Sequence, residues 1–155
     1  MAPAETRIPR YWEDVREGET LPEVVMPVTL SLCVLDAAAT RDFFPGHHDR
    51  DYARGQNARD VYLNTMFFHG FVDRVAGDWA GPDAWLWRRR LDMVAPVCVG
   101  DTIRTAARVV RHYREEERGL VEIEMQVLTE HGLGAKASLT YILPSRADIG
   151  PEGVR

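Results

Sequence analysis

Apolar and polar residues alternate along most of the second half of the chain. Within residues 120–130 the apolar positions alternate with polar ones, as Val121, Ile123, Met125 and Val127 do with Glu122, Glu124 and Gln126. Strand-like patterns also occupy residues 84–94, 102–115 and 136–143. This spacing is typical of strands with one buried and one solvated face. We therefore expect a run of long strands, with REEERG and EHGLG as hairpin turns.

The middle of the chain has helical spacing instead. Residues 66–81 carry large apolar side chains at helical intervals: Met66, Phe67, Phe71, Val75 and Trp79. The segment just before them, residues 61–65 (VYLNT), has the composition of a short strand. We expect this apolar helix to be wrapped by other elements.

The N-terminal third predicts one short strand and one helix. Residues 23–30 are strand-like, and Pro27 suits the edge of a sheet because proline has no N–H to donate. Thr29 or Ser31 then has the side chain to cap a helix. We expect this helix to end before Pro45.

An apolar helix followed by long half-buried strands indicates an α+β domain, in which a curved antiparallel sheet wraps around the helix. The 155 residues fit one domain that needs no metal or disulfide to stabilise its core. We expect this domain to span residues 11–145. Residues 1–10 should form a flexible N-terminal arm, and residues 146–155, rich in polar residues, glycine and proline, a flexible tail.

Composition excludes several classes of partner. The net charge is -5 and the basic residues are interspersed with acidic ones, so nucleic acid is not expected as a partner. Cys33 and Cys98 form neither a metal motif nor a disulfide framework. The N-terminus has no signal-peptide pattern, and no apolar stretch is long enough to cross a membrane. We expect a soluble cytoplasmic protein.

Residues 41–53, RDFFPGHHDRDYA, are dense in reactive side chains. Pro45 and Gly46 are the preferred central residues of a type II turn, which would fold His47 back toward Asp42 so that the two side chains hold one water. In an alternative without catalysis, Asp42 caps a helix and His47 is a surface imidazole. A metal cluster is a further alternative for His47, His48, Asp49 and His69, although adjacent ligands in an extended chain point apart and the spacing matches no common zinc site.

The same stretch resembles the signature of a known family. DFFPGHHD has the skeleton D-x-x-P-x-H-x-D of MaoC-like enoyl-CoA hydratases, which are hot-dog proteins. Residues 11–22 (YWEDVREGETLP), 67–70 (FFHG) and 96–102 (PVCVGDT) resemble further landmarks of that family in the same order. HHDRD, DVYLNT and DRVAGDWAGP are similar to the small subunits of actinobacterial steroid side-chain hydratases, which work in heteromers.

The resemblance implies a reaction and the residues that perform it. Asp42 and His47 would move the protons that add water to a 2-enoyl-CoA thioester, and the sequence leaves open which of them is the base. Gly70 would lie at the start of the central helix and offer its N–H to the thioester oxygen. The CoA thioester is the substrate, so no metal, redox or other cofactor is expected.

Four further residues are candidates for substrate binding. Phe43 and Phe44 would line an acyl pocket or belong to the core, and Phe44 replaces the asparagine that is usual in the family. His69 would touch substrate or satisfy a buried hydrogen bond. Asn64 would cap the helix or contact the ligand.

Two other functions stay open beside the hydratase. One is a hot-dog thioesterase, and the other is a non-catalytic subunit that completes a partner's active site. The acyl-CoA is the expected small-molecule partner. Because a hot-dog sheet leaves an edge exposed, we expect a homodimer, with a heteromer as the alternative, in which a related hot-dog subunit adds room for the acyl group.

Overall fold

The computed structural model describes residues 9–148. Its helices and strands follow one another along the chain in this order: η1 (Trp12–Asp14), β1 (Val25–Pro27), α1 (Leu30–Thr40), η2 (Pro45–His47), α2 (Arg50–Gly55), α3 (Thr65–Ala80), β2 (Trp85–Met93), β3 (Thr102–Glu115), β4 (Arg118–Thr129), β5 (Gly132–Leu143) and η3 (Arg146–Asp148).

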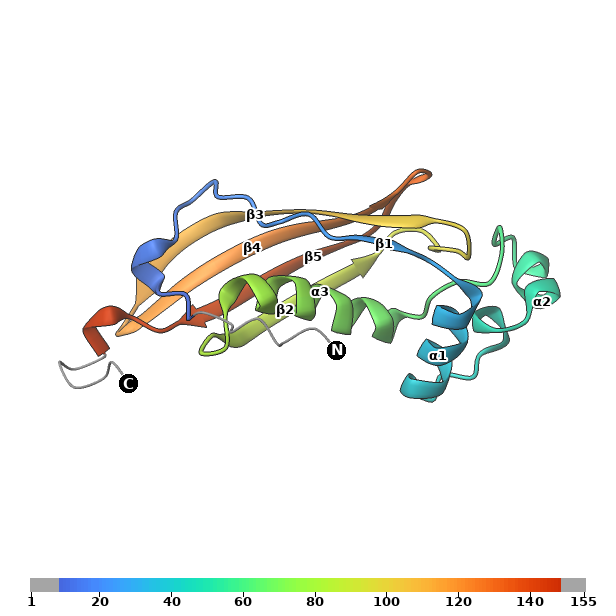
Figure 1. Ribbon diagram of the computed structural model, residues 1–155, viewed down its shortest axis with the longest axis horizontal. Helices are drawn as coiled ribbons and strands as arrows, with labels where there is room; N and C mark the ends of the chain where they lie inside the picture. The colour runs from blue at the N-terminus through green and yellow to red at the C-terminus, as the bar shows by residue number, and fades with distance from the viewer. Residues whose placement is uncertain (1–8, 149–155) are drawn as a thin grey trace, which may run out of the picture.

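The five strands form one antiparallel sheet in the order β1-β3-β4-β5-β2. The sheet curves over α3, while α1 and α2 lie beyond the N-terminal end of α3 (Figure 1). Strands β1 and β2 are the two edges, and β2 is much the longer of them. The expected α+β class, with a curved sheet around one helix, is confirmed.

The core lies between the concave face of the sheet and α3. The alternating apolar residues of β4 that the sequence predicted are all buried. One face of helix α3 is buried against these strand residues. Its buried residues are Phe68, Phe71, Val72, Val75, Ala76, Trp79 and Ala80. Met66 was expected on this face but is 56% exposed, because the buried stripe is centred on Phe68 and Val72 instead.

The segment before α3 differs from the prediction. Residues 61–65 do not form a strand; Tyr62 makes only an isolated bridge with Cys98. The preceding connection contains a short helix, α2, that the sequence analysis missed. Its N-cap is Asp49, whose side chain accepts the N–H of Tyr52 at 3.0 Å.

Most of the predicted arm and tail, residues 1–8 and 149–155, lies outside the described residues. Two residues next to these segments contact the domain. Arg10 lies over the ring of Trp79 and pairs with Glu19, and Arg146 pairs with Asp14 at 2.7 Å. No helix within residues 9–148 is long and apolar enough to span a membrane.

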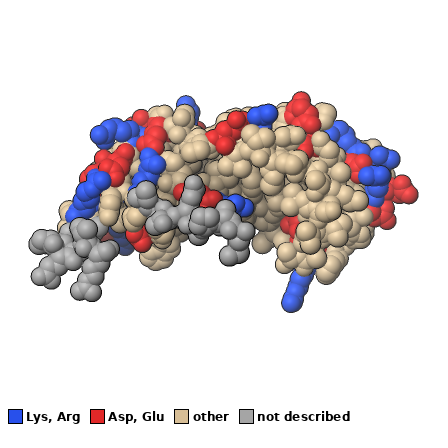
Figure 2. All heavy atoms as spheres, in the orientation of Figure 1, with Lys and Arg blue, Asp and Glu red and all other residues tan. Residues whose placement is uncertain are grey.

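The charged residues of the surface lie close to residues of opposite sign. Figure 2 shows this mixture on one face, where blue and red side chains adjoin one another. Cross-strand ion pairs contribute to it, such as Arg111 with Glu122 at 3.0 Å and Arg108 with Glu124 at 3.5 Å. On the face seen in Figure 2, no large patch of one sign stands out.

Candidate active site

Asp42 and His47 are brought together by the turn that follows α1. The helix ends at Thr40, and Arg41 adopts a left-handed conformation, with φ of 59°, that turns the chain away. Pro45 then begins the short 3-10 helix η2, whose last residue is His47. Nε2 of His47 lies 3.5 Å from Oδ2 of Asp42. The turn thus produces the proximity that the sequence predicted.

The turn is not of the predicted type. A type II turn needs a positive φ at its third residue, here Gly46. Within residues 9–148 Gly46 is not among the glycines with positive φ, and Pro45–His47 form a 3-10 helix instead. Glycine is needed at this position for close packing, because a Cβ there would lie 2.5 Å from Oη of Tyr62 and 2.9 Å from Cε1 of Phe44.

The imidazole of His47 is held in one orientation. Its Nδ1 lies 2.8 Å from the backbone carbonyl oxygen of Tyr62. A carbonyl oxygen only accepts hydrogen bonds, so Nδ1 carries the proton and Nε2 faces Asp42. The His47 side chain is 8% exposed and that of Asp42 is 41% exposed. Solvent therefore reaches the pair from the side of Asp42.

A buried polar network joins α1 to the N-terminus of α3 behind this pair. Oδ2 of Asp36 accepts the N–H of Asn64 at 3.1 Å, and the Asn64 amide donates to Oγ1 of Thr40 at 2.6 Å. Asn64 is also the N-cap of α3, as expected, and accepts the N–H of Phe67 at 2.9 Å. Burial raises the pKa of Asp36, although the Asn64 N–H and then His47 act to lower it.

The position of Gly70 differs from the prediction. Helix α3 begins at Thr65, so Gly70 lies in its second turn and not at its start. The N–H of Gly70 is therefore directed along the helix toward the carbonyl of Met66. The N–H groups that lack intrahelical partners belong to the first turn, which begins with Thr65 and Met66. The positive end of the helix dipole lies there too.

A cavity of about 370 Å³ connects the pair to this helix N-terminus. Its wall includes Asp42, His47, Asn64 and Thr65. Residues 93–96 also line it, and this segment begins at the last residue of β2. The cavity thus opens beside the end of a free sheet edge.

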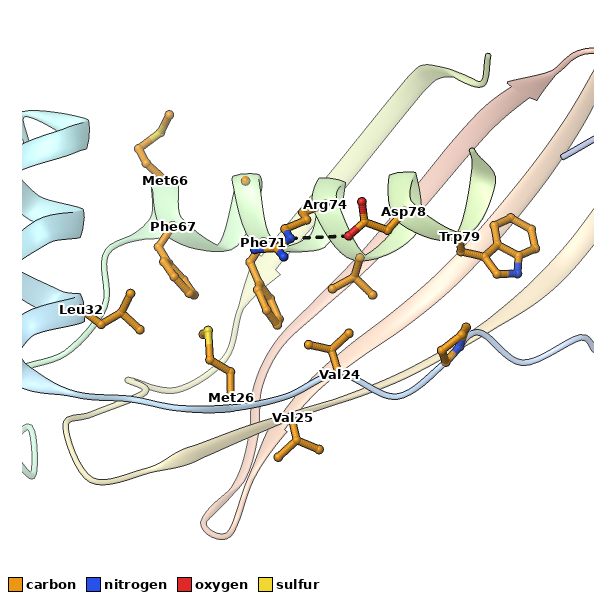
Figure 3. Close-up of a pocket in the computed structure, with 13 residues that line it drawn as sticks. Val24, Val25, Met26, Leu32, Met66, Phe67, Phe71, Arg74, Asp78 and Trp79 are labelled. Atoms are coloured by element: carbon orange, nitrogen blue, oxygen red, sulfur yellow. Dashed lines mark ion pairs between the residues drawn. The ribbon is translucent and has the colours of Figure 1, made fainter. Parts of the chain in front are cut away.

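A larger apolar groove, of about 720 Å³, lies along α3 (Figure 3). Phe67 and Phe71 of α3 stack with ring centroids 5.6 Å apart and point toward Val24 and Met26 (Figure 3). Gly70 also borders this groove and is exposed, with nothing within 4 Å of the position of a Cβ. The groove and the smaller cavity both adjoin the first turn of α3, because Met66 lines the groove and Thr65 the cavity.

Of the other predicted substrate-binding residues, one lines the cavity and two line neither space. Phe44 is 42% exposed and lines the cavity with Asp42 and His47. Phe43 is 65% exposed and lines neither the cavity nor the groove. His69 lines neither space; its Nδ1 is buried without a hydrogen-bond partner among residues 9–148, and its carbonyl accepts from Arg89 at 3.4 Å.

The residues considered for a metal cluster have separate contacts. Nε2 of His48 lies 3.2 Å from the carbonyl oxygen of Phe43, while Asp49 caps α2. In the described part of the chain, the group with ligand-like spacing is Asp101, Glu130 and His131. There the guanidinium of Arg59 already donates to both oxygens of Asp101, at 2.7 and 2.6 Å.

Sequence reasoning missed Asp36 and Tyr62. The buried residues of α1 are Cys33, Asp36 and Ala37, so an acidic residue lies on the apolar stripe of the helix. That irregularity was a visible signal, because unpaired carboxylates are seldom buried. The role of Tyr62 rests on its backbone carbonyl, for which the sequence holds no signal.

Comparison with known proteins identifies the family. No protein-family model matches the chain. The chain is 37% identical over 129 residues to the 3-oxo-4,17-pregnadiene-20-carboxyl-CoA hydratase beta subunit of Mycobacterium tuberculosis, with 83% of this chain and 95% of the relative covered. The chain belongs to the MaoC-like hydratase family. An (R)-specific enoyl-CoA hydratase of Rhodospirillum rubrum is 30% identical over 107 residues, or 68% of this chain and 74% of that protein.

Solved structures confirm the hot-dog fold of this MaoC-like chain. The ChsH1-ChsH2 complex of Mycobacterium tuberculosis has a chain that matches with a TM-score of 0.78 and 29% identity, covering 83% of this chain and 98% of that one. The R-hydratase PhaJ1 of Pseudomonas aeruginosa matches with a TM-score of 0.77 over 88% of this chain and 86% of its own. At 17% identity, this second match bears on the fold alone.

Proposed function

We propose that the chain hydrates 2-enoyl-CoA thioesters, with Asp42 and His47 holding the attacking water. The observation that carries the proposal is the 3.5 Å approach of Nε2 of His47 to Oδ2 of Asp42, on a cavity that the start of α3 also lines. Hydration needs an acceptor for a proton of water, a donor to Cα, and a positive field for the thioester oxygen. Two side chains and one helix N-terminus can supply these.

Asp42 and His47 together can accept and donate the protons that the proposed reaction moves. The water oxygen bonds to Cβ, the π electrons of the Cα–Cβ double bond move toward the thioester carbonyl, and the resulting enolate takes a proton at Cα. One member of the pair accepts a proton from water and the other donates the proton to Cα. Because Nδ1 of His47 is engaged by Tyr62, both transfers use Nε2 and the Asp42 carboxylate. We assign the oxyanion contact to the first-turn N–H groups of α3 in place of Gly70.

The substrate class follows from the groove and the relative. The reaction needs no metal or redox cofactor, since the CoA thioester itself stabilises the enolate. A groove of about 720 Å³ with phenylalanine and tryptophan walls suits a large apolar acyl group. The Mycobacterium tuberculosis relative is named as acting on a pregnadiene-carboxyl-CoA. We therefore propose a polycyclic acyl group, with Gly70 leaving the groove open.

The working form that we propose is an assembly of hot-dog subunits. The relative is named a beta subunit, and the ChsH1-ChsH2 structure is a complex. In this chain β2 is a nine-residue free edge, and the cavity beside His47 opens at its end. A related hot-dog subunit along β2 would close that opening. A homodimer through the same edge is the alternative.

One assay distinguishes the candidate functions. The chain, alone and with a co-expressed related hot-dog subunit, is incubated with crotonyl-CoA and with a polycyclic 2-enoyl-CoA. Enoyl absorbance and free thiol are followed separately. We expect enoyl absorbance to fall without thiol release, faster with the polycyclic substrate. Thiol release would indicate a thioesterase, and hydration that survives loss of both Asp42 and His47 would indicate that the partner carries the chemistry.

A further inference from the structure

A carboxylate that the proposed hydration chemistry does not use lies behind the Asp42–His47 pair. Asp36 is 7% exposed and lines neither the cavity nor the groove. Its neighbours on the buried stripe of α1 are Cys33 and Ala37. A buried carboxylate costs stability unless hydrogen bonds or a counter-charge compensate for the lost water.

The groups around Asp36 offer little compensation. Its side chain accepts a hydrogen bond from the backbone N–H of Asn64, and no Lys or Arg within residues 9–148 pairs with it. The charged groups that act on it are His47 from η2 and Asp42 from the turn after α1. The cationic candidate among them is the imidazole of His47.

The titratable groups packed around this site support that view. On α1, burial first and Asp36 second raise the pKa of the Cys33 thiol to about 12, so this thiol stays neutral and brings no counter-charge. Tyr62, which lines the cavity with Asp42 and His47, has a pKa raised by burial, and its phenol is neutral too. Among these groups, the imidazole of His47 is therefore the one that can carry a positive charge.

We propose that Asp36 is a positioning residue of this site: its carboxylate fixes the start of α3 against the Asp42–His47 pair and, as the anion behind the pair, favours the protonated imidazole of His47. The mechanical half of this role follows from the Asn64 N–H bond, because Asn64 and Thr65 line the same cavity as the pair. The electrostatic half follows from the same geometry, because Asp36 bonds to Asn64, which lines the cavity with His47, and His47 acts on the Asp36 carboxylate. The proposal rests on the proposed hydratase function for its effect on rate.

Two substitutions separate the two halves. Asp36→Asn keeps an oxygen that can accept the Asn64 N–H but removes the charge. Asp36→Ala removes both. Burial raises the pKa of Asp36, so the ionised carboxylate weakens the fold as pH rises from the ordinary aspartate pKa through the folded value. Asp36→Asn should therefore melt no earlier than wild type, whereas Asp36→Ala should melt earlier because the Asn64 N–H loses its acceptor.

The kinetic test uses whichever form, the chain alone or its hot-dog complex, hydrates enoyl-CoA. We expect Asp36→Asn to lower kcat about tenfold with KM little changed, the scale of a misplaced or mischarged acid/base group. The limb of the pH profile of kcat that reports His47 should move to lower pH. The matched control is Asp83→Asn, an exposed aspartate in the loop before β2, which should leave kcat and the profile unchanged.

A second measurement does not depend on activity. The ring signals of His47 are followed through a pH titration by NMR in the histidine-labelled chain, with His47→Gln for assignment. In Asp36→Asn the midpoint for His47 should move to lower pH by about half a unit or more, because a nearby anion has been removed. The other histidines should not move. This shift without any hydration would sink the proposed function but support the Asp36–His47 coupling. An unmoved midpoint with unchanged kcat would overturn the positioning role, even if the variants melt earlier.

Discussion

Nδ1 of His47 lies 2.8 Å from the backbone carbonyl oxygen of Tyr62, which fixes the orientation and the tautomer of the imidazole. Tyr62 is itself held by a bridge to Cys98, in the segment between β2 and β3. Nε2 is therefore directed toward Asp42 by main-chain atoms from distant parts of the sequence. No single side-chain substitution can remove that acceptor.

The pair itself provides the first prediction. Asp42→Asn and His47→Gln should each lower kcat/KM for hydration by at least about a hundredfold, since positioned acid/base groups contribute on that scale. The thermal midpoint should change little, because Asp42 is 41% exposed and glutamine approximates the length of histidine. Steady-state kinetics with a thermal melt measures both. Near-normal turnover in either variant would exclude the residue from catalysis.

The close packing of Gly46 leads to the second prediction. In Gly46→Ala the new Cβ would lie 2.5 Å from Oη of Tyr62, so either Tyr62 or η2 has to shift. A shift of η2 would move His47 relative to the Tyr62 carbonyl that orients it, and we expect kcat to fall at least about tenfold. The matched control is Gly55→Ala at the end of α2, where nothing lies within 4 Å of the added Cβ. Equal activity of the two variants would contradict this account.

The sequence predicted the sheet better than the site. The alternation in β3 and β4 and the apolar spacing of α3 reflect burial, which local pattern records directly. The order of elements along the chain predicted a curved sheet around the helix, and the resemblance supplied the hot-dog name; the strand order was not predicted. The prediction of a strand at residues 61–65 was wrong, because their apolar residues are buried by tertiary contacts. Only Tyr62 forms a bridge there.

Within the site, the sequence predicted which side chains meet but not what holds them. Asp42 and His47 are close because of a local turn, and local turns leave a signature in proline and glycine. The Tyr62 carbonyl and the Asp36–Asn64 bond are long-range contacts that involve backbone atoms, and these leave none. Gly70 was misplaced because a sequence motif does not reveal where a helix starts.

Gly70 supplies the third prediction, which concerns the groove. Gly70→Ala should stabilise the fold by up to about 1 kcal/mol, because glycine is a poor residue inside a helix. It should also raise KM for a polycyclic enoyl-CoA more than for crotonyl-CoA, since the methyl group enters the groove. Gly77→Ala, on the same helix and outside the groove, should stabilise without changing KM. Equal effects on KM for both substrates would contradict the placement of the acyl group in the groove.

The fourth prediction concerns acid stability. Burial alone would raise the pKa of Asp101, but hydrogen bonds from Arg59 and from the Cys98 N–H outweigh it and hold this pKa below its usual value. The stability that ionised Asp101 contributes through these bonds is therefore complete above the ordinary aspartate pKa. It is lost as pH falls through the lower pKa of Asp101 in the folded protein. Asp101→Asn should lower the unfolding free energy by roughly 2 kcal/mol at neutral pH and by less in acid. Urea unfolding at two pH values measures this; a pH-independent difference would contradict it.

The last prediction is that the chain works through its β2 edge and not as a monomer. Trp85 is 65% exposed and Met93 is 38% exposed, at the two ends of β2. Trp85→Glu and Met93→Glu should each abolish association while leaving the fold intact, because neither side chain is buried in the single chain. Leu35→Glu is the matched control, since Leu35 is 66% exposed on α1, which is not part of the sheet. Light scattering with circular dichroism tests all three variants.

Salt distinguishes the two possible assemblies. A two-fold homodimer that pairs β2 about its central residue, Arg89, would place Arg88 opposite the partner's Arg90 and Arg89 opposite its own copy. Such a homodimer should tighten as salt screens the repulsion between these arginines, although ion pairs of Arg89 with Asp73 and of Arg90 with Asp92 reduce it. A heteromer with carboxylates facing the arginines should weaken instead. The composition of the complex at low and high salt, read by native mass spectrometry and light scattering, decides between them, and a stable monomer with full hydratase activity would exclude both.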